Sequence, residues 1–369
     1  NSAILIKEDS ILSYTTVPVG MIRDFSISMF NHYGLSKKDS ETVTKILLSA
    51  DLFGIESHGV QRLIRYQKTL SKGQVVAKPE IETLKETELS ATLDAHQCLG
   101  HIAGDYAMRL AIEKAKKCGV GMVAVRNSSH FGIAGYYTTL TLPERMIGVA
   151  MTNTEQIGIP TFGARPMFGT NPIAFSMPAH PFPFWFDAAT TVVPLGKMEV
   201  YEKAGKPLPT EWAVNTAGQE ERDPHEVRRR IRERDLGGIL PLGGIGKEHS
   251  GHKGYGFALI AEICSSILAG GLTCTHMADG TGKERTSHFF AAIDYGMFGD
   301  KDQMEDALSD YLQEIRDSEK AEGQTQIYTH GQRAWLSREE KLKTGIPLQD
   351  STVAELRGIG DLIGIPFPL

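Results

Sequence analysis

The chain has 369 residues, of which 41% are hydrophobic and 23% charged, a balance typical of a globular protein with one or two domains. Its net charge of −6 is accompanied by no basic stripe, which argues against nucleic acid and anionic membranes as partners. No apolar run reaches the ~18 residues of a membrane span, and Lys7, Glu8 and Asp9 interrupt the first apolar stretch where a signal peptide would need one, so we expect a cytoplasmic protein.

The N-terminal third is predicted to be helical. Residues 21–33 carry apolar side chains at helical spacing, and Gly34 ends the pattern. Ser36 is suited to cap the next helix, whose apolar face leads into the segment 54–59. A third helix is expected over residues 60–70.

The middle of the chain alternates between helix and strand. An amphipathic helix is predicted over residues 103–117, ended by Gly119, and a buried strand over 120–125 follows it. Further short strands are predicted at 147–152, 173–177 and 184–186. Buried strands mixed with helices predict an α/β fold.

The C-terminal half contains more irregular sequence. Residues 196–251 are rich in glycine, proline and charge, and we expect long surface connections there with one charged helix at 224–234. Residues 255–268 are apolar on nearly every side, which predicts a buried helix. Residues 302–320 show the pattern of a charged amphipathic helix.

A Rossmann-type phosphate-binding turn is absent. Gly119 and Gly121 give G-x-G, but Ala124 occupies the third glycine position, and these residues follow a helix and precede a strand. Pyrophosphate binding in the Rossmann fold needs the order strand, turn, helix, so that the phosphate meets a helix N-terminus. A dinucleotide would therefore have to bind to another architecture.

The first candidate site is the segment from Ser57 to Arg62. His58 and Arg62 are four residues apart, so on a helix they would share one face. A guanidinium can bind the carboxylate of a 2-hydroxy or 2-keto acid, while a histidine exchanges a proton with the neighbouring oxygen. The spacing alone favours a plainer alternative, in which Ser57 caps a helix and both side chains lie in water.

Two further candidates follow predicted strands, where α/β proteins commonly build sites. His130 lies in the polar segment 126–132 and is a second acid/base or cofactor-contact candidate, with an ordinary polar turn as an equal alternative. Asp187 opens the segment 187–191, and its carboxylate could accept a hydrogen bond from a ribose hydroxyl or orient a histidine. Alternatively, Asp187 caps the segment that follows it.

A fourth candidate is the glycine-rich segment 251–256, which contains Lys253 and leads into the apolar helix. The segment suits a phosphate, although a turn needed for close packing is the alternative. His249 and His252 have H-x-x-H spacing without a neighbouring carboxylate, and the four cysteines form no C-x-x-C pair, so we expect no metal site. Unpatterned cysteines also suit a reducing cytosol.

Seven segments in a fixed order give the chain a resemblance to a known family. They read ADLFGIESHGVQRL, AIEKAKKCGVGMVAVRNSSHFGIAGYY, MIGVAMTN, GTNPIAF, FDAATT with GKMEVY, LPLGG and GHKGYGFAL. Together they resemble the type 2 malate/L-lactate dehydrogenases, NAD(P)-dependent 2-hydroxyacid oxidoreductases that lack the Rossmann fold. The series runs roughly from residue 20 to 345 and is far more specific than any single motif.

The resemblance implies a fold and an assembly. It predicts an α/β cofactor domain with a mixed, non-Rossmann sheet and flanking helices over residues 96–334. It also predicts a helical domain built from both chain ends, residues 1–95 and 335–369. A homodimer with active sites near the subunit interface is expected as well.

The resemblance also implies roles for individual residues, and it outweighs the plainer alternative for the first site. His58 matches the acid/base residue, with Ser57 beside it and Arg62 on the substrate carboxylate, while His130 matches a histidine given the acid/base role in some members. The matching cofactor contacts, for NAD or possibly NADP, are Asp187, Ala188, Thr190, His252, Lys253, Gly331 and Gln332.

Some positions depart from the family pattern. The residues from His330 to Arg333 stand where Pro-Gly-Glu is usual, which puts that cofactor contact in doubt and leaves an inactive binding protein as an alternative. Malate is the expected substrate, with lactate, sulfolactate, ureidoglycolate, diketogulonate or a cyclic imino acid as alternatives. A serine hydrolase is a poor alternative because no G-x-S-x-G is present.

Overall fold

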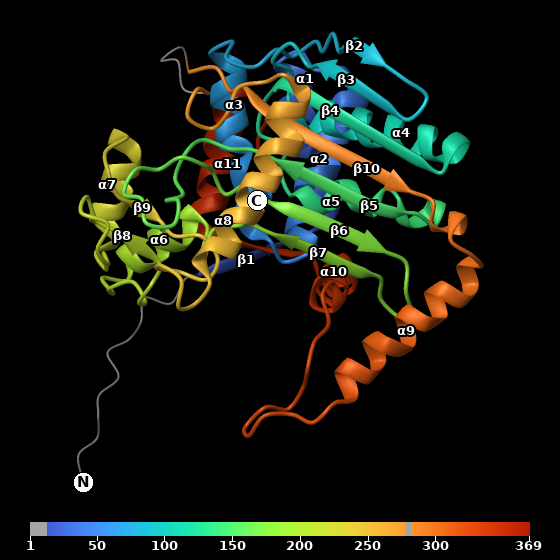
Figure 1. Cartoon of the computed structure of the whole chain (residues 1–369). Helices are drawn as coiled ribbons and strands as arrows, with labels where there is room; N and C mark the ends of the chain where they lie inside the picture. Colours follow the sequence, from blue (N-terminus) through green and yellow to red (C-terminus); the bar gives the residue numbers. More distant parts are fainter. Residues whose placement is uncertain (1–12, 278–281) are drawn as a thin grey trace.

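A seven-stranded mixed sheet forms the centre of the molecule (Figure 1). The computed structural model describes residues 13–277 and 282–369. The strands, in their order across the sheet, are β2 (Glu82–Glu86), β3 (Ser90–Asp94), β4 (Val120–Ser128), β10 (Thr286–Ile293), β5 (Ile147–Thr152), β6 (Ile173–Met177) and β7 (Phe184–Ala188). Only the β3–β4 pair is parallel. The predicted mixed-sheet α/β fold is confirmed, and every predicted strand is present.

Helix α4 (Gly100–Cys118) packs tightly against the sheet. Its apolar residues lie in the main core with those of β4 and β10. Gly119 ends the helix with a φ of 80°, a left-handed conformation that glycine adopts without strain. At Gly121 a Cβ atom would lie 1.9 Å from the carbonyl oxygen of Ala111, so the small residue lets helix and strand approach closely. The glycines that imitate a Rossmann turn therefore serve packing.

Both ends of the chain build the helical part of the molecule. Its main helices are α1 (Val19–His32), α2 (Lys37–Leu52), α3 (Leu63–Ser71) and α11 (Asp350–Ile363). Strand β1 (Tyr14–Val17) pairs antiparallel with β11 (Ile346–Gln349), and one apolar core contains residues from both ends. Ser36 accepts a hydrogen bond from the backbone of Asp39 at 3.1 Å, which confirms it as the cap of α2.

We propose the same two domains that the resemblance implies, with one adjustment. Strands β2 and β3 pair within the large sheet, although residues 82–94 fall in the predicted helical part. Sheet membership therefore favours a boundary ahead of β2 instead of after residue 95.

The region 196–251 is more ordered than its composition suggests. It contains the expected helix α7 (Pro224–Glu233), but α6 (Leu195–Lys203) and a small sheet of β8 (Ala213–Val214) and β9 (Gly238–Ile239) are also present. These elements enclose an apolar cluster that includes Met198 and Val227, both fully buried. The prediction of long surface connections was wrong because a few apolar residues, widely spaced among charged ones, are enough to form a local core.

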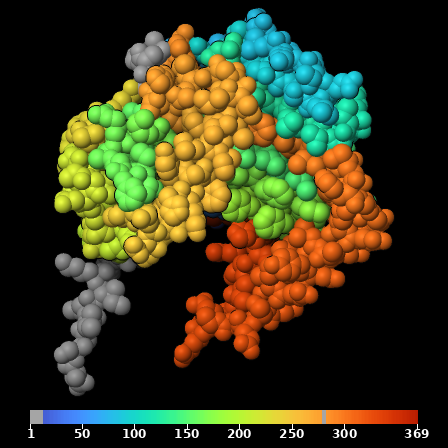
Figure 2. All heavy atoms as spheres, in the orientation of Figure 1, coloured from blue at the N-terminus to red at the C-terminus, as the bar shows by residue number. Residues whose placement is uncertain are grey.

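Helix α8 (Gly251–Glu262) and the π-helical turn after it (Ile263–Ile267) lie at the surface, and residues of this part of the chain form the gold surface in Figure 2. Six apolar side chains there are 40% to 56% exposed. They are Phe257, Leu259, Ile260, Ile263, Ile267 and Leu268. The prediction of a buried helix was wrong, since one side packs on the sheet while the other is covered by no described part of this chain.

The C-terminal part contains α9 (Lys301–Asp317), which projects from the body in Figure 1, and α10 (Gln332–Thr344). Helix α9 confirms the charged amphipathic helix predicted at 302–320. Short helix α5 (Ala134–Thr139) follows β4 and packs on β5 and β6. Among the described residues no helix combines the length and apolarity needed to cross a membrane.

Candidate active site

The segment that carries His58 folds as two single helical turns instead of the start of a long helix. A 3₁₀ turn at Glu56–His58 and another at Val60–Arg62 precede α3 and are separated by Gly59. A Cβ at Gly59 would lie 1.9 Å from Oδ1 of Asp51. The Oδ2 atom of Asp51 accepts a hydrogen bond from the backbone of Val60 at 2.8 Å. His58 and Arg62 therefore do not share a continuous helix face, because Gly59 between them has extended backbone angles.

Arg62 is nevertheless tied to the histidine's segment. Its Nε atom donates to the carbonyl oxygen of Ser57 at 2.6 Å, which closes the two turns on each other. In the described parts of the chain Arg62 has no carboxylate partner within 4.0 Å. Its terminal guanidinium nitrogens are therefore available for an anion from outside the chain.

His58 and His130 lie together, as the site hypothesis requires. Their rings are stacked, with centroids 5.5 Å apart and planes inclined by 22°. His130 lies between the end of β4 and α5, whereas His58 comes from the helical part. The site is therefore formed where the sheet meets the helices from the N-terminal end.

Tyr66 holds the ring of His130. The tyrosine hydroxyl lies 2.7 Å from Nδ1 of His130, and the backbone N–H of Gly132 donates to the same atom at 3.4 Å. Burial raises the pKa of Tyr66, so its hydroxyl keeps its proton. A backbone N–H can only donate, so the contact from Gly132 makes Nδ1 an acceptor, and the hydroxyl of Tyr66 donates to it as well. Because Nδ1 receives these donors, the hydrogen of the neutral imidazole belongs on Nε2. His130 is therefore arranged as a hydrogen-bond donor toward a substrate oxygen.

Ser57 contacts the other histidine. Its hydroxyl lies 2.9 Å from Nδ1 of His58. A hydroxyl can either donate or accept, so His58 can carry its hydrogen on Nδ1 and keep a free lone pair on Nε2. That tautomer is the one a general base needs.

Glu284, which is distant in sequence, holds the backbone of His130 in place. Its Oε2 atom accepts the backbone N–H of His130 at 2.6 Å, while Oε1 accepts from Nη2 of Arg65 at 2.5 Å. Tyr66, Arg65 and Glu284 belong to the site although local sequence patterns did not indicate them. Tyr66 follows Arg62 by about one helical turn, which is a usable signal, but nothing in the local sequence points to Glu284.

Both histidines are neutral at ordinary pH. Burial, followed by the charges of Arg62 and Arg65, lowers the pKa of His58 to about 4. Burial and then the charge of Arg65 hold the pKa of His130 well below its usual value. An unprotonated imidazole beside an unpaired guanidinium can remove a proton from a bound hydroxy acid.

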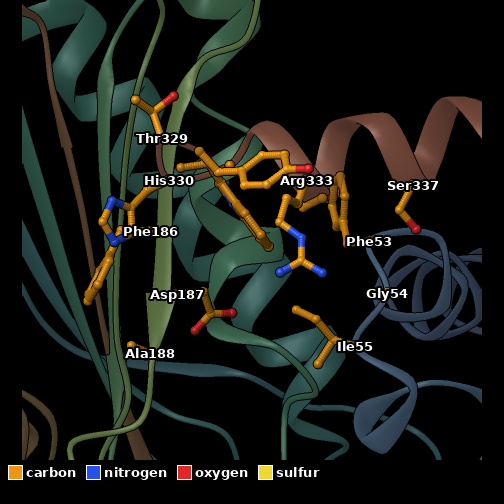
Figure 3. Close-up of a pocket in the computed structure, with 14 residues that line it drawn as sticks. Phe53, Gly54, Ile55, Phe186, Asp187, Ala188, Thr329, His330, Arg333 and Ser337 are labelled. Carbon is orange, nitrogen blue, oxygen red and sulfur yellow. The ribbon is translucent and has the colours of Figure 1, made fainter. Parts of the chain in front are cut away.

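A cavity of about 620 Å³ lies next to the segment that carries His58 (Figure 3). Ile55 belongs to its wall, and the carbonyl oxygen of Ile55 accepts the backbone N–H of His58 at 3.0 Å. The lining comes from the α2 end, from β7 and from the loop before α10 with its first turns. It consists of Phe53, Gly54, Ile55, Trp185, Phe186, Asp187, Ala188, Tyr328, Thr329, His330, Gly331, Arg333, Ala334 and Ser337.

Asp187 supplies the carboxylate of this cavity. Its Oδ2 atom accepts the backbone N–H of Gly135 at 2.7 Å, so it caps α5 and not the segment that follows it. Burial raises the pKa of Asp187 to about 6. Its other oxygen has no protein donor among the described residues and can accept a ribose hydroxyl.

Gly331 allows the loop before α10 to approach β7. Its φ is +96°, and a Cβ would lie 2.9 Å from both the carbonyl oxygen of Pro183 and the Cβ of Trp185. The backbone of Trp185 donates to the carbonyl of His330 at 3.3 Å. The loop and the strand thus form two sides of one cavity.

The predicted cofactor residues are only partly brought together. Asp187, Ala188 and Gly331 line the cavity. The other four do not line it. Thr190 bonds to the carbonyl of Thr170, Gln332 is buried at the start of α10, and His252 and Lys253 lie in the first turn of α8. Their cofactor contacts stay predictions.

The cavity fits a dinucleotide in size and chemistry. Ligand pockets of 300–1,000 Å³ with apolar and aromatic walls and few polar groups are usual for cofactors, as an order of magnitude. Here aromatic rings form much of the wall, and one carboxylate and one guanidinium belong to it. The described residues contain no group of three or more His, Cys, Asp or Glu side chains that could hold a metal ion.

Comparison with known proteins agrees with this site. Residues 17–357 match the family model described as malate/L-lactate dehydrogenase. A malate dehydrogenase of Pyrococcus abyssi is 40% identical over 354 residues, 96% of this chain and 96% of that protein. An L-sulfolactate dehydrogenase of Methanocaldococcus jannaschii is 35% identical over 92% of this chain and 94% of its own. The crystal structure of malate dehydrogenase from Entamoeba histolytica superposes with a TM-score of 0.93 at 33% identity and covers 97% of this chain and 100% of that one.

The fold and the paired histidines thus belong to an oxidoreductase. The chain is a member of the malate/L-lactate dehydrogenase family, which confirms the resemblance found in its sequence motifs.

Proposed function

We propose that this enzyme reversibly oxidises a 2-hydroxy acid to a 2-keto acid with NAD or NADP, and that malate is its substrate. The observation that carries the proposal is the meeting of neutral His58, donor His130 and unpaired Arg62 next to the cavity. Malate is favoured over sulfolactate because the relative named malate dehydrogenase is 40% identical to this chain, whereas the one named L-sulfolactate dehydrogenase is 35% identical.

Each group has one role in the oxidation. Arg62 binds the substrate carboxylate through its terminal nitrogens and thereby orients C2. Nε2 of His58 takes the hydroxyl proton, while Ser57 keeps the hydrogen of that ring on Nδ1. His130 donates from Nε2 to the same substrate oxygen, which becomes a carbonyl. A bound nicotinamide would supply the acceptor for the hydride from C2.

The cofactor is proposed to lie in the cavity between β7 and α10. Asp187 would accept a ribose hydroxyl, and the backbone at Ala188 and Gly331 would line the bound molecule. The predicted contacts of Thr190, His252, Lys253 and Gln332 would require the cofactor to extend beyond this cavity.

A homodimer is proposed for the assembly. The six exposed apolar side chains between Phe257 and Leu268 support this arrangement, because soluble surfaces rarely leave such a stripe uncovered. A second copy would present the same stripe, so a twofold interface can cover both.

The four cysteines are all free thiols, which fits the reducing cytoplasm as the site of action.

The test is an absorbance assay at the nicotinamide band. Malate, lactate and sulfolactate are each offered with NAD and with NADP, and oxaloacetate is offered with the reduced cofactors. We expect turnover with malate and at least one cofactor. Turnover of none of these acids, combined with tight cofactor binding in a fluorescence titration, would instead identify a binding protein that kept the fold.

A further inference from the structure

Arg333 is a cation in the wall of the cofactor cavity that no proposed step has used. It is the second residue of α10, and its side chain extends from that helix into the cavity, in the direction of Asp187 and Ile55 (Figure 3). Among the lining residues, all of which the structure describes, it carries the only permanent positive charge. Its neighbours in the loop, His330 and Gln332, bring no negative charge.

The guanidinium of Arg333 has no ion-pair partner among the described residues. Within the described part of the chain no carboxylate lies within 4.0 Å of it, and Asp187 across the cavity is not paired with it. It lies over the ring of Tyr328, 5.5 Å from the centroid. Arg316 differs from Arg333, because its guanidinium nitrogens donate hydrogen bonds to the side chains of Thr329 and Gln313.

The two charged side chains of the cavity, Asp187 and Arg333, suit different parts of a bound dinucleotide. A carboxylate repels phosphate but accepts from hydroxyls, so the Asp187 side suits a ribose. A guanidinium presents paired N–H donors that match the oxygens of a phosphate. The exposed ring of Tyr328 beside it offers a face on which a purine can stack.

We infer that Arg333 binds a phosphate group of the dinucleotide. The inference rests on the proposed function, since it places the cofactor in this cavity. The shared chemistry is phosphate recognition, and two phosphates could supply it. The pyrophosphate occurs in both NAD and NADP, whereas the 2′-phosphate occurs in NADP alone.

The experiment measures cofactor binding without turnover. NADH and NADPH are titrated separately into the wild-type enzyme and into Arg333→Ala and Arg333→Lys, and nicotinamide emission is followed. Arg338→Ala is the matched control, because Arg338 lies on the same helix, stacks over Trp335 at 5.7 Å and does not line the cavity. Thermal unfolding of each variant checks that the fold is intact.

We expect Arg333→Ala to raise the Kd of at least one cofactor about 10- to 100-fold, the usual effect of losing a hydrogen-bonded charge. Arg333→Lys should lose less, and Arg338→Ala nothing. A loss for NADPH alone assigns the 2′-phosphate, and equal losses for both assign the pyrophosphate. Unchanged Kd values for both cofactors in a folded Arg333→Ala would overturn the inference. Failure of the wild-type enzyme to bind either cofactor would instead overturn the proposed function.

Discussion

The imidazole ring of His58 lies against that of His130, with the centroids 5.5 Å apart and an angle of 22° between the planes. The two rings are held by different partners, since Ser57 contacts Nδ1 of His58 and Tyr66 contacts Nδ1 of His130. The backbone N–H of Gly132 also points at Nδ1 of His130 and can only donate, so that atom is an acceptor, whereas Ser57 can accept from Nδ1 of His58. Two chemically identical side chains can therefore act as a base and as a hydrogen-bond donor at one oxygen.

His58→Ala is expected to lower kcat for malate oxidation by about 100-fold or more, because it removes the proposed proton acceptor. Cofactor binding should survive, since His58 is not part of the cavity wall. His130→Ala, measured in parallel, should leave more activity, because a donor to the oxygen is lost while the base remains. The reverse order of the two losses would transfer the role of base to His130.

Arg62→Ala should raise KM for malate at least tenfold, because the terminal nitrogens of Arg62 are proposed to bind the substrate carboxylate through charged hydrogen bonds. Steady-state kinetics at saturating cofactor measure the change. Arg23→Ala is the control, since Arg23 is exposed and pairs with the neighbouring Asp24. An unchanged kcat/KM in Arg62→Ala would remove Arg62 from the substrate site.

His58 should stay unprotonated to a lower pH than an ordinary histidine. Its pKa is lowered to about 4, first by burial and then by Arg62. The free base therefore persists above about pH 5, and the rate of oxidation should fall only as the pH drops through about 4. Histidine-labelled NMR spectra, with His58→Gln to assign the signal, report this titration directly.

Replacing Arg62 by Gln should raise the midpoint of that titration, because a positive charge that disfavours the imidazolium is removed. A midpoint near the ordinary histidine value of about 6.5 in the wild-type enzyme would contradict the burial of this ring.

The oligomeric state should depend on the surface of α8 and its following turn. Ile263→Asp combined with Ile267→Asp places two charges on side chains that are 50% and 55% exposed, and we expect the dimer to dissociate into monomers. Light scattering after size exclusion measures the mass. Leu362→Asp is the control, because Leu362 is 66% exposed on α11, a helix that packs on α1, α3 and the pair β1–β11. A wild-type monomer, or a double variant that stays dimeric, would place the interface elsewhere or abolish it.

Much of the architecture follows from local sequence patterns. Helical periodicity located α1 and α4, and alternation between turns and apolar runs located β5 and β6 at the bounds observed. Ser36 and Gly119 marked a helix start and a helix end through their own hydrogen bonding and backbone freedom. These features depend on residues within one turn of each other, which is why they can be predicted from the order of residues alone.

The burial of α8 could not be predicted in this way. Residues 255–268 are apolar on nearly every side, but one side of the helix packs on the sheet and the other faces outward. Periodicity reports which side chains are apolar, and only the packing of the whole chain decides what covers them. The small core around Met198 escaped prediction for the same reason, since its members are scattered over distant turns.

By itself, the sequence determined the family, several of the strands and helices, and the identity of the groups that can do the chemistry, while strands such as β2, β3 and β10 were not predicted. The tertiary structure decided their environment. It brings Tyr66 to His130, 64 residues away along the chain, and it places Glu284 on the backbone of His130. It also leaves Arg62 without a carboxylate partner among the described residues. Proton affinity and charge pairing depend on burial and on neighbours brought in from distant segments, and these exist only once the chain has folded.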